Sequence, residues 1–103
     1  MIEDSIFSGI YGESGGAIFL GYIDLTNVVL RNNIFVNNFA YLKGGAIFVK
    51  TLSNSNVFME NNTFENNLAN EVPDIYIHHP LHSELQIEIT FMNNTFKNSF
   101  ASS

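Results

Sequence analysis

A repeat with a period of about 29 residues constrains the fold of this chain more than any other feature. The element Gly15-Gly16-Ala17-Ile18-Phe19 recurs 29 residues later as Gly44-Gly45-Ala46-Ile47-Phe48. Phenylalanine recurs at a similar spacing, at Phe7, Phe35, Phe64 and Phe96. A constant period in this range is typical of proteins that stack one structural unit on the next.

Alignment of the copies on these phenylalanines places asparagine over asparagine. One column holds Asn32, Asn61 and Asn93, and the next column holds Asn33, Asn62 and Asn94. In stacked strands, each amide can donate to one neighbour and accept from the other. We therefore expect ladders of asparagine, and a ladder of the four phenylalanines, to run along the stack.

Each complete copy contains three candidate strands. In the second copy they are Val28–Arg31, Ile34–Val36 and Ala46–Val49, and the polar segment Lys50–Asn56 is expected to be the loop to the next copy. The Asn pair suits a sharp corner, because asparagine tolerates the left-handed conformation. The turn glycines lack Cβ atoms where the chain must bend or pass close to a neighbour; they are Gly15, Gly16, Gly44 and Gly45.

These patterns predict an all-β fold, a single-stranded right-handed parallel β-helix of about three and a half coils, with three short strands per coil. The coils of this single domain are expected around residues 1–27, 28–56, 57–88 and 89–103. Apolar and polar residues alternate in the last coil, so four side chains should point inward: Leu85, Ile87, Ile89 and Phe91. A β-sandwich of hairpins is the competing fold, but it predicts neither a constant period nor aligned asparagines.

The third copy departs from the pattern. Pro73-Asp74-Ile75-Tyr76-Ile77 occupies the place of the Gly-Gly-Ala-Ile-Phe element, and extra length falls around His78–Ser83. His78, His79 and His82 could share Zn²⁺ or Ni²⁺ with Asp74 or Glu84 as an oxygen ligand. The alternative is an exposed polar loop. We expect no metal and no other cofactor.

Composition excludes several classes of function. The net charge is −6, and the four cations are scattered along the chain, so the basic track needed to bind nucleic acid is absent. No apolar run approaches the ~18 residues of a membrane-spanning segment, so no membrane insertion is expected. The chain has no cysteine, which excludes disulfides and thiolate sites. The acidic N-terminus does not resemble a secretory signal; if the native protein is exported, the chain is mature or excerpted.

The two motifs together resemble a known family. Gly-Gly-Ala-Ile, at 15–18 and 44–47, and Phe-x-x-Asn, at 35–38 and 64–67, resemble the repeats in the passenger regions of chlamydial polymorphic outer-membrane proteins. Similar repeats occur in large surface proteins of some protists and other bacteria. Phe7 and Phe96 depart from the second motif. The resemblance implies a right-handed, pectin-lyase-like β-helix with an adhesive or structural role at the cell surface, and it implies no catalytic residues.

Catalysis would require clustered acids, and the aligned columns do not supply them. Glu60 falls beside Arg31 and Met92, while Glu65 falls beside Val36 and Lys97. Inverting hydrolysis needs two carboxyl groups about 6.5–9.5 Å apart. We therefore predict no catalytic residue, and a polysaccharide-binding or polysaccharide-degrading enzyme is the alternative.

Glycans are possible partners in two ways. Asn61-Asn62-Thr63 and Asn93-Asn94-Thr95 are formal glycosylation sequons, although the corner motif explains these asparagines on structural grounds alone. Tyr41, in the loop before Gly44, is the best candidate among the four tyrosines for stacking on a sugar ring; the others are Tyr11, Tyr22 and Tyr76.

The sequence thus predicts a non-catalytic structural or binding module. We expect a segment of an extracellular or cell-surface adhesin, or a subunit docked in a larger assembly. An uncapped coil exposes unpaired backbone groups, so protein partners or further coils are expected at one or both ends.

Overall fold

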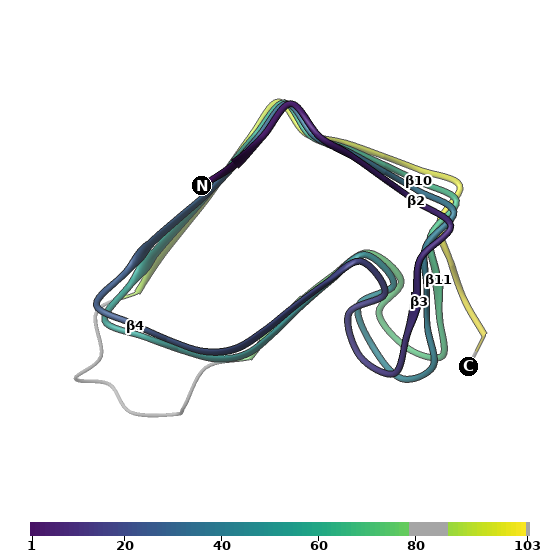
Figure 1. The fold of residues 1–103 in the computed structure, drawn as a ribbon, viewed down its shortest axis with the longest axis horizontal. Helices are drawn as coiled ribbons and strands as arrows, with labels where there is room; N and C mark the ends of the chain where they lie inside the picture. Colours follow the sequence, from purple (N-terminus) through teal and green to yellow (C-terminus); the bar gives the residue numbers. More distant parts are fainter. Residues whose placement is uncertain (79–86, 103) are drawn as a thin grey trace.

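A computed structural model describes residues 1–78 and 87–102, and this part of the chain consists of strands and turns without a helix. Viewed along its short axis, the chain runs round the same path about three times (Figure 1). Successive coils pair in parallel, about 29 residues apart. The predicted all-β parallel solenoid is confirmed.

The described strands form four parallel sheets; the first three coils contribute to all four, and the last coil contributes to sheets 1 to 3. Sheet 1 contains β1 (Ile2–Glu3), β5 (Asn27–Arg31), β9 (Asn56–Glu60) and β13 (Glu88–Met92). Sheet 2 contains β2 (Ile6–Ser8), β6 (Ile34–Val36), β10 (Thr63–Glu65) and β14 (Thr95–Lys97). Sheet 3 contains β3 (Tyr11–Gly12), β7 (Phe39–Ala40), β11 (Leu68–Ala69) and β15 (Phe100–Ala101). Sheet 4 contains β4 (Ile18–Asp24), β8 (Ile47–Ser53) and β12 (Ile75–Ile77).

The expectation of three strands per coil is therefore wrong by one. The missed strands are those of sheet 3, which are two residues long and too short to show alternation. The expected loop Lys50–Asn56 is also wrong, because β8 continues to Ser53 and β9 begins at Asn56. The backbone pairs with β4 in the neighbouring coil whatever the polarity of the side chains, so polar composition was a poor guide here.

The phenylalanine column lies in the core. Phe7, Phe35, Phe64 and Phe96 pair in register, with ring centroids 4.9, 4.9 and 4.8 Å apart and ring planes within 6° of parallel. Phe35 and Phe64 are fully buried. Around them pack the other buried apolar side chains, chiefly Leu30, Ile47, Val49, Leu52, Val57 and Met59. Parallel pairing thus converts a spacing of the sequence into a vertical stack of rings.

The two asparagine columns have different roles. The first column lies at an exposed corner in the left-handed conformation, with φ of 58° at Asn32, 56° at Asn61 and 57° at Asn93. The second column makes the ladder, and its Asn33 and Asn62 are buried. Asn62 Nδ2 donates to the Leu30 carbonyl at 2.9 Å, and Asn62 Oδ1 accepts from the Asn33 amide at 3.0 Å. Most partners in this ladder are backbone groups of the adjacent coil, not the amide–amide partners expected from the sequence.

The glycine pairs sit where the coils come closest. Gly44 has φ of +69°, and a Cβ on Gly45 would lie 2.1 Å from the Pro73 carbonyl oxygen of the next coil. Gly15 and Gly16 occupy the same positions one coil earlier, where a Cβ on Gly16 would meet the Gly45 carbonyl oxygen at 2.1 Å. Any larger residue would force neighbouring coils apart.

The register of the third copy differs by one residue from the sequence alignment. Ile75 pairs with Ile47, so Asp74 lies beneath Ala46 and not beneath Gly45. The physical reason is the connection between β11 and β12, which is one residue shorter than the connection between β7 and β8.

In the last coil the predicted inward-facing residues occupy core columns, but their side chains are partly exposed to solvent. Ile89 and Phe91 pair with the buried Val57 and Met59, yet they are 41% and 49% exposed. Ile87 is half-buried against the core, and Leu85 lies outside the described residues. These side chains are exposed because, among the described strands, β13 has a neighbour on one side only, and not because they point outward.

Candidate functional site

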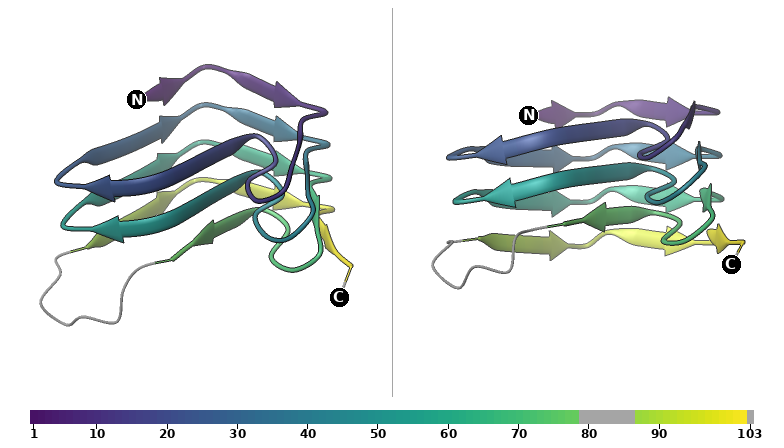
Figure 2. Two further views of the ribbon diagram at one scale, coloured as in Figure 1. Left: turned by 60° about the horizontal axis from the view of Figure 1, so that its bottom comes forward. Right: turned by 90° about the horizontal axis from the view of Figure 1, so that it is seen from below.

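The connections from sheet 3 to sheet 4 form loops that stack on one another in successive coils. They comprise residues 13–17, 41–46 and 70–74, and we refer to them as the loop stack. The loops project to the same side in successive coils (Figure 2). Backbone hydrogen bonds join them, from the Leu42 amide to the Glu13 carbonyl at 2.8 Å and from the Glu71 amide to the Leu42 carbonyl at 2.9 Å. The same pairing that builds the sheets therefore holds these loops in order.

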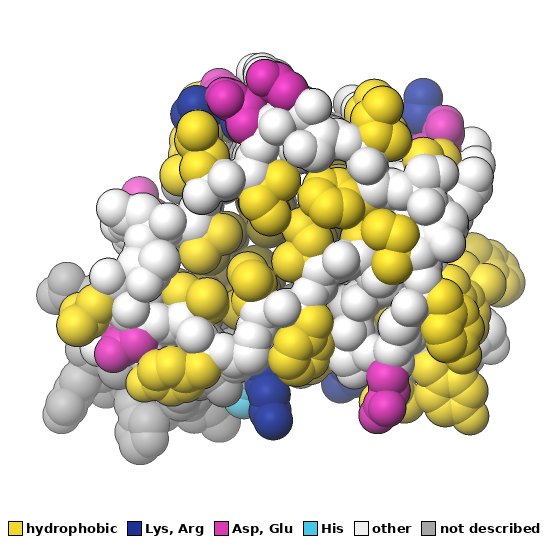
Figure 3. Space-filling view, in the orientation of Figure 1, with side chains coloured by type: hydrophobic (Ala, Val, Ile, Leu, Met, Phe, Trp, Pro, Cys, Tyr) yellow, Lys and Arg dark blue, Asp and Glu magenta, His cyan; other side chains and the backbone are white. Residues whose placement is uncertain are grey.

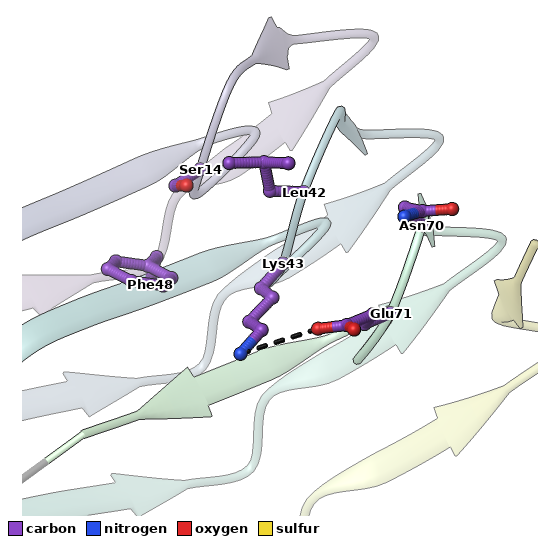
Figure 4. A pocket seen from close by; sticks show the side chains of 6 residues that line it. All are labelled: Ser14, Leu42, Lys43, Phe48, Asn70 and Glu71. Carbon is purple, nitrogen blue, oxygen red and sulfur yellow. Dashed lines mark ion pairs between the residues drawn. The ribbon is translucent and has the colours of Figure 1, made fainter. Parts of the chain in front are cut away.

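Three clefts lie along the loop stack. The first, of about 310 Å³, is lined by Ser14, Leu42, Lys43, Phe48, Asn70 and Glu71 (Figure 4). The second, of about 180 Å³, is lined by Phe39, Tyr41, Asn70 and Ser102. The third, of about 440 Å³, is lined by Tyr11, Glu13, Tyr41 and Leu42, and we call it the tyrosine cleft. Shared lining residues make the three clefts neighbours on one surface.

Lys43 occupies the first cleft and is held on two sides. Its Nζ lies 3.3 Å from Glu71 Oε2 (Figure 4). The same atom lies 4.6 Å from the centre of the Tyr76 ring. The hydrogen bond to Glu71, followed by the charge interaction with Tyr76, raises the pKa of Lys43 above its ordinary value of 10.5. Lys43 therefore stays protonated at neutral pH and is unsuited to act as a general base.

Aromatic rings line the outer face of sheet 4 beside this cleft. Phe19, Phe48 and Tyr76 form a column with centroids 5.4 and 5.1 Å apart. Because the rings cover one another's faces, the column presents mainly ring edges to solvent. Tyr41, the sugar-stacking candidate, is different: it is 63% exposed and lies beside a cleft.

Two acids on the strands, Glu60 and Glu65, are paired with cations in the predicted register. Glu60 lies 3.0 Å from Arg31, and Glu65 lies 3.4 Å from Lys97. Asp24 pairs with Ser53 and accepts its hydroxyl at 3.0 Å. Among the described residues, no group of three or more histidines and acids is close enough to hold a metal ion.

Of the three histidine candidates, the structure describes only His78. His78 is exposed, and its Nδ1 lies 3.0 Å from the Lys50 carbonyl oxygen. His79, His82 and Glu84 lie outside the described residues, so a metal site there stays a prediction. Asp74, the other suggested ligand, accepts hydrogen bonds from Asn67 Nδ2 at 3.0 Å and Ser99 Oγ at 2.6 Å.

Two features escaped the sequence reasoning. Asn38, Asn67 and Ser99 form a second ladder of hydrogen bonds, and Asp74 belongs to it. In the sequence, this role was indicated only by an aspartate at the position where the second copy has Ala46. Glu13 joins Tyr11 and Tyr41 in the tyrosine cleft, and no sequence motif pointed to it.

The sequon asparagines, Asn61 and Asn93, are exposed at one corner, and the threonines of the two sequons pair with each other.

Comparison of the chain with protein-family models, curated proteins and solved structures gives no match. The described part of the chain also contains no helix that is long and apolar enough to cross a membrane.

Proposed function

We propose that the chain is a non-catalytic structural and binding module that docks on other proteins through the ends of its coil stack. The observation that carries this proposal is the exposure of core side chains at both ends. At the first coil, a cleft of about 190 Å³ opens into the core between Ile2, Leu20, Ile23 and Leu30. Apolar side chains gather in the middle of this face (Figure 3).

The opposite end is similar in character. Phe91 and Phe96 belong to inward-facing columns, but each is about half exposed in the last coil, at 49% and 48%. Strands at both ends also present unpaired backbone groups. Apolar surface next to open strand edges favours pairing with another protein or with further coils.

The repeat motifs support a more specific proposal about the kind of protein. Their likeness to chlamydial passenger repeats supports a right-handed, pectin-lyase-like β-helix, a segment of an adhesin, and a place at the cell surface or outside the cell. The alternative is a polysaccharide-binding or polysaccharide-degrading enzyme. No arrangement of acids in the described residues favours that alternative, because Glu60 and Glu65 are paired with cations.

The experiment is a measurement of native mass by light scattering over a range of protein concentrations. We expect particles heavier than the 11.6 kDa chain, with a mass that rises with concentration. Phe91→Lys should reduce this association, whereas Tyr22→Lys, a matched change of an exposed aromatic residue on the side of the stack, should not.

Two results would overturn the proposal. A monodisperse monomer at every concentration would contradict docking through the ends. Release of sugars from pectin or a uronate polymer, abolished by a single acid substitution, would contradict the non-catalytic assignment.

A further inference from the structure

We infer that the tyrosine cleft binds an alkylammonium group, presented as a lysine side chain by a protein partner. This inference rests on the proposed docking function and specifies the chemistry of the partner. The cleft has a volume of about 440 Å³ and is lined by Tyr11, Glu13, Tyr41 and Leu42. It therefore combines two phenol rings, one carboxylate and one aliphatic side chain.

The two rings are accessible to a ligand. Tyr11 is 70% exposed and Tyr41 is 63% exposed. Tyr11 stacks on Phe39, with centroids 4.8 Å apart, so one face of its ring is covered and its position is fixed. An ammonium group within about 6 Å of a ring centre is attracted by the electron-rich face of the ring.

Charge favours a cation at this cleft. Glu13 is exposed and forms no ion pair within the described part of the chain. Residues 1–27 contain no lysine or arginine, and Glu13 is the acid among them that lines the cleft. An exposed carboxylate without a cation partner attracts ligands of positive charge.

The neighbouring cleft shows the same recognition within the chain itself. There, the ammonium group of Lys43 lies between the Glu71 carboxylate, at 3.3 Å, and the Tyr76 ring, at 4.6 Å from its centre. The tyrosine cleft has the same two kinds of group, and its lining contains no lysine or arginine. The loop stack thus already places one lysine between a tyrosine and a glutamate, and it offers a second such arrangement to a partner.

A neutral sugar could also stack on Tyr41 and donate its hydroxyls to Glu13, but it carries no positive charge to pair with that carboxylate. The unpaired carboxylate of Glu13 therefore favours the cation over the sugar. The two ligands differ in one measurable respect: binding of a cation weakens as salt is added, whereas binding of a neutral sugar does not.

The test is a titration of the full chain followed by NMR signals of the Tyr11 and Tyr41 rings. The probe is N-acetyl-lysine methylamide, and its neutral control is the norleucine analogue, which lacks the ammonium group. We expect the lysine probe to bind more tightly than the norleucine probe. Added sodium chloride should weaken lysine binding, because the Glu13 charge is exposed to screening.

Substitutions then locate the site. Glu13→Gln should weaken lysine binding by about threefold, and Tyr41→Leu by a similar factor. The matched controls are Glu88→Gln, another exposed acid that forms no ion pair within residues 1–78 and 87–102, and Tyr22→Leu, an exposed tyrosine outside the three clefts. Neither control should change the affinity.

The inference fails if the norleucine analogue binds as tightly as the lysine probe, if both glutamate variants lose affinity equally, or if a neutral oligosaccharide binds and lysine does not. Absence of lysine binding in a chain that still associates through its ends would sink this inference alone and leave the proposed function standing. The salt dependence in the unmodified chain decides the matter even if a variant fails to fold.

Discussion

At the scale of single residues, the two asparagines of each pair have different structural roles. Asn61 is exposed and adopts φ of 56°, so its backbone conformation makes the corner. Asn62 is buried, and its side-chain amide hydrogen-bonds to backbone groups of the coil before it. One asparagine is present for its backbone and the next for its side chain, although the sequence shows only a repeated pair.

Substitution of this pair should separate the two roles. Asn62→Ala leaves the Leu30 carbonyl and the Asn33 amide without their side-chain partners, and we expect the free energy of unfolding to fall by about 2–4 kcal/mol. Asn61→Ala should cost about 1 kcal/mol, because alanine is strained at positive φ, and Asn61→Gly should cost little. Urea unfolding measures all three. Equal losses at positions 61 and 62 would contradict the division of roles.

Lys43 gives a second prediction, on pH. Its pKa lies above 10.5 in the folded chain, so the Glu71 interaction stabilises the fold below about pH 10.5 and is lost as the pH rises through the pKa of the folded state. NMR titration of the Lys43 side chain should show the raised pKa, and Glu71→Gln should return it towards 10.5. Glu88→Gln, the control, should leave it raised. An unchanged pKa in Glu71→Gln would refute the assignment of cause.

At the scale of elements, sheet 2 is organised around the phenylalanine ladder. Each ring stacks on the ring of the next coil within 5 Å, so β2, β6, β10 and β14 share one column of apolar contacts. Burial is nevertheless unequal along this column. Phe35 and Phe64 are covered on both sides, whereas Phe96 is 48% exposed.

This inequality predicts graded costs of truncation. Phe64→Ala should lower the free energy of unfolding by about 3–5 kcal/mol, since it removes a fully buried ring and two stacking contacts. Phe96→Ala should cost about 1–2 kcal/mol, because half of that ring already contacts water. Thermal or urea unfolding of the two variants provides the comparison. A cost at Phe96 as large as that at Phe64 would mean that the end coil is covered in solution.

At the scale of the whole molecule, stability should follow position in the stack. Inner coils have neighbours on both sides, and end coils have a neighbour on one side only. In stacked repeats each unit is stabilised mainly by the interfaces with its neighbours. The same open ends that favour docking should therefore be the least protected parts of the free chain.

Hydrogen exchange tests this gradient. At low protein concentration, backbone amides in β6, β9 and β10 should be protected most, and those in β14 and β15 should exchange faster. Raising the concentration should slow exchange in the end strands if docking occurs there. Uniform protection at low concentration would show that the coils open only as one unit.

The sequence by itself determined the period, and the period was enough to establish the parallel solenoid and the register of its inner columns. The physical reason is local: in parallel, in-register pairing each residue meets its own counterpart, so Phe35 meets Phe64 and Arg31 meets Glu60 without further information. The tertiary structure decided the arrangement of the segments that lie between the repeated columns. The two-residue strands of sheet 3, the shift that places Asp74 under Ala46, and the meeting of Glu13 with Tyr41 depend on how loops of different length stack, and no single position in the chain encodes that contact.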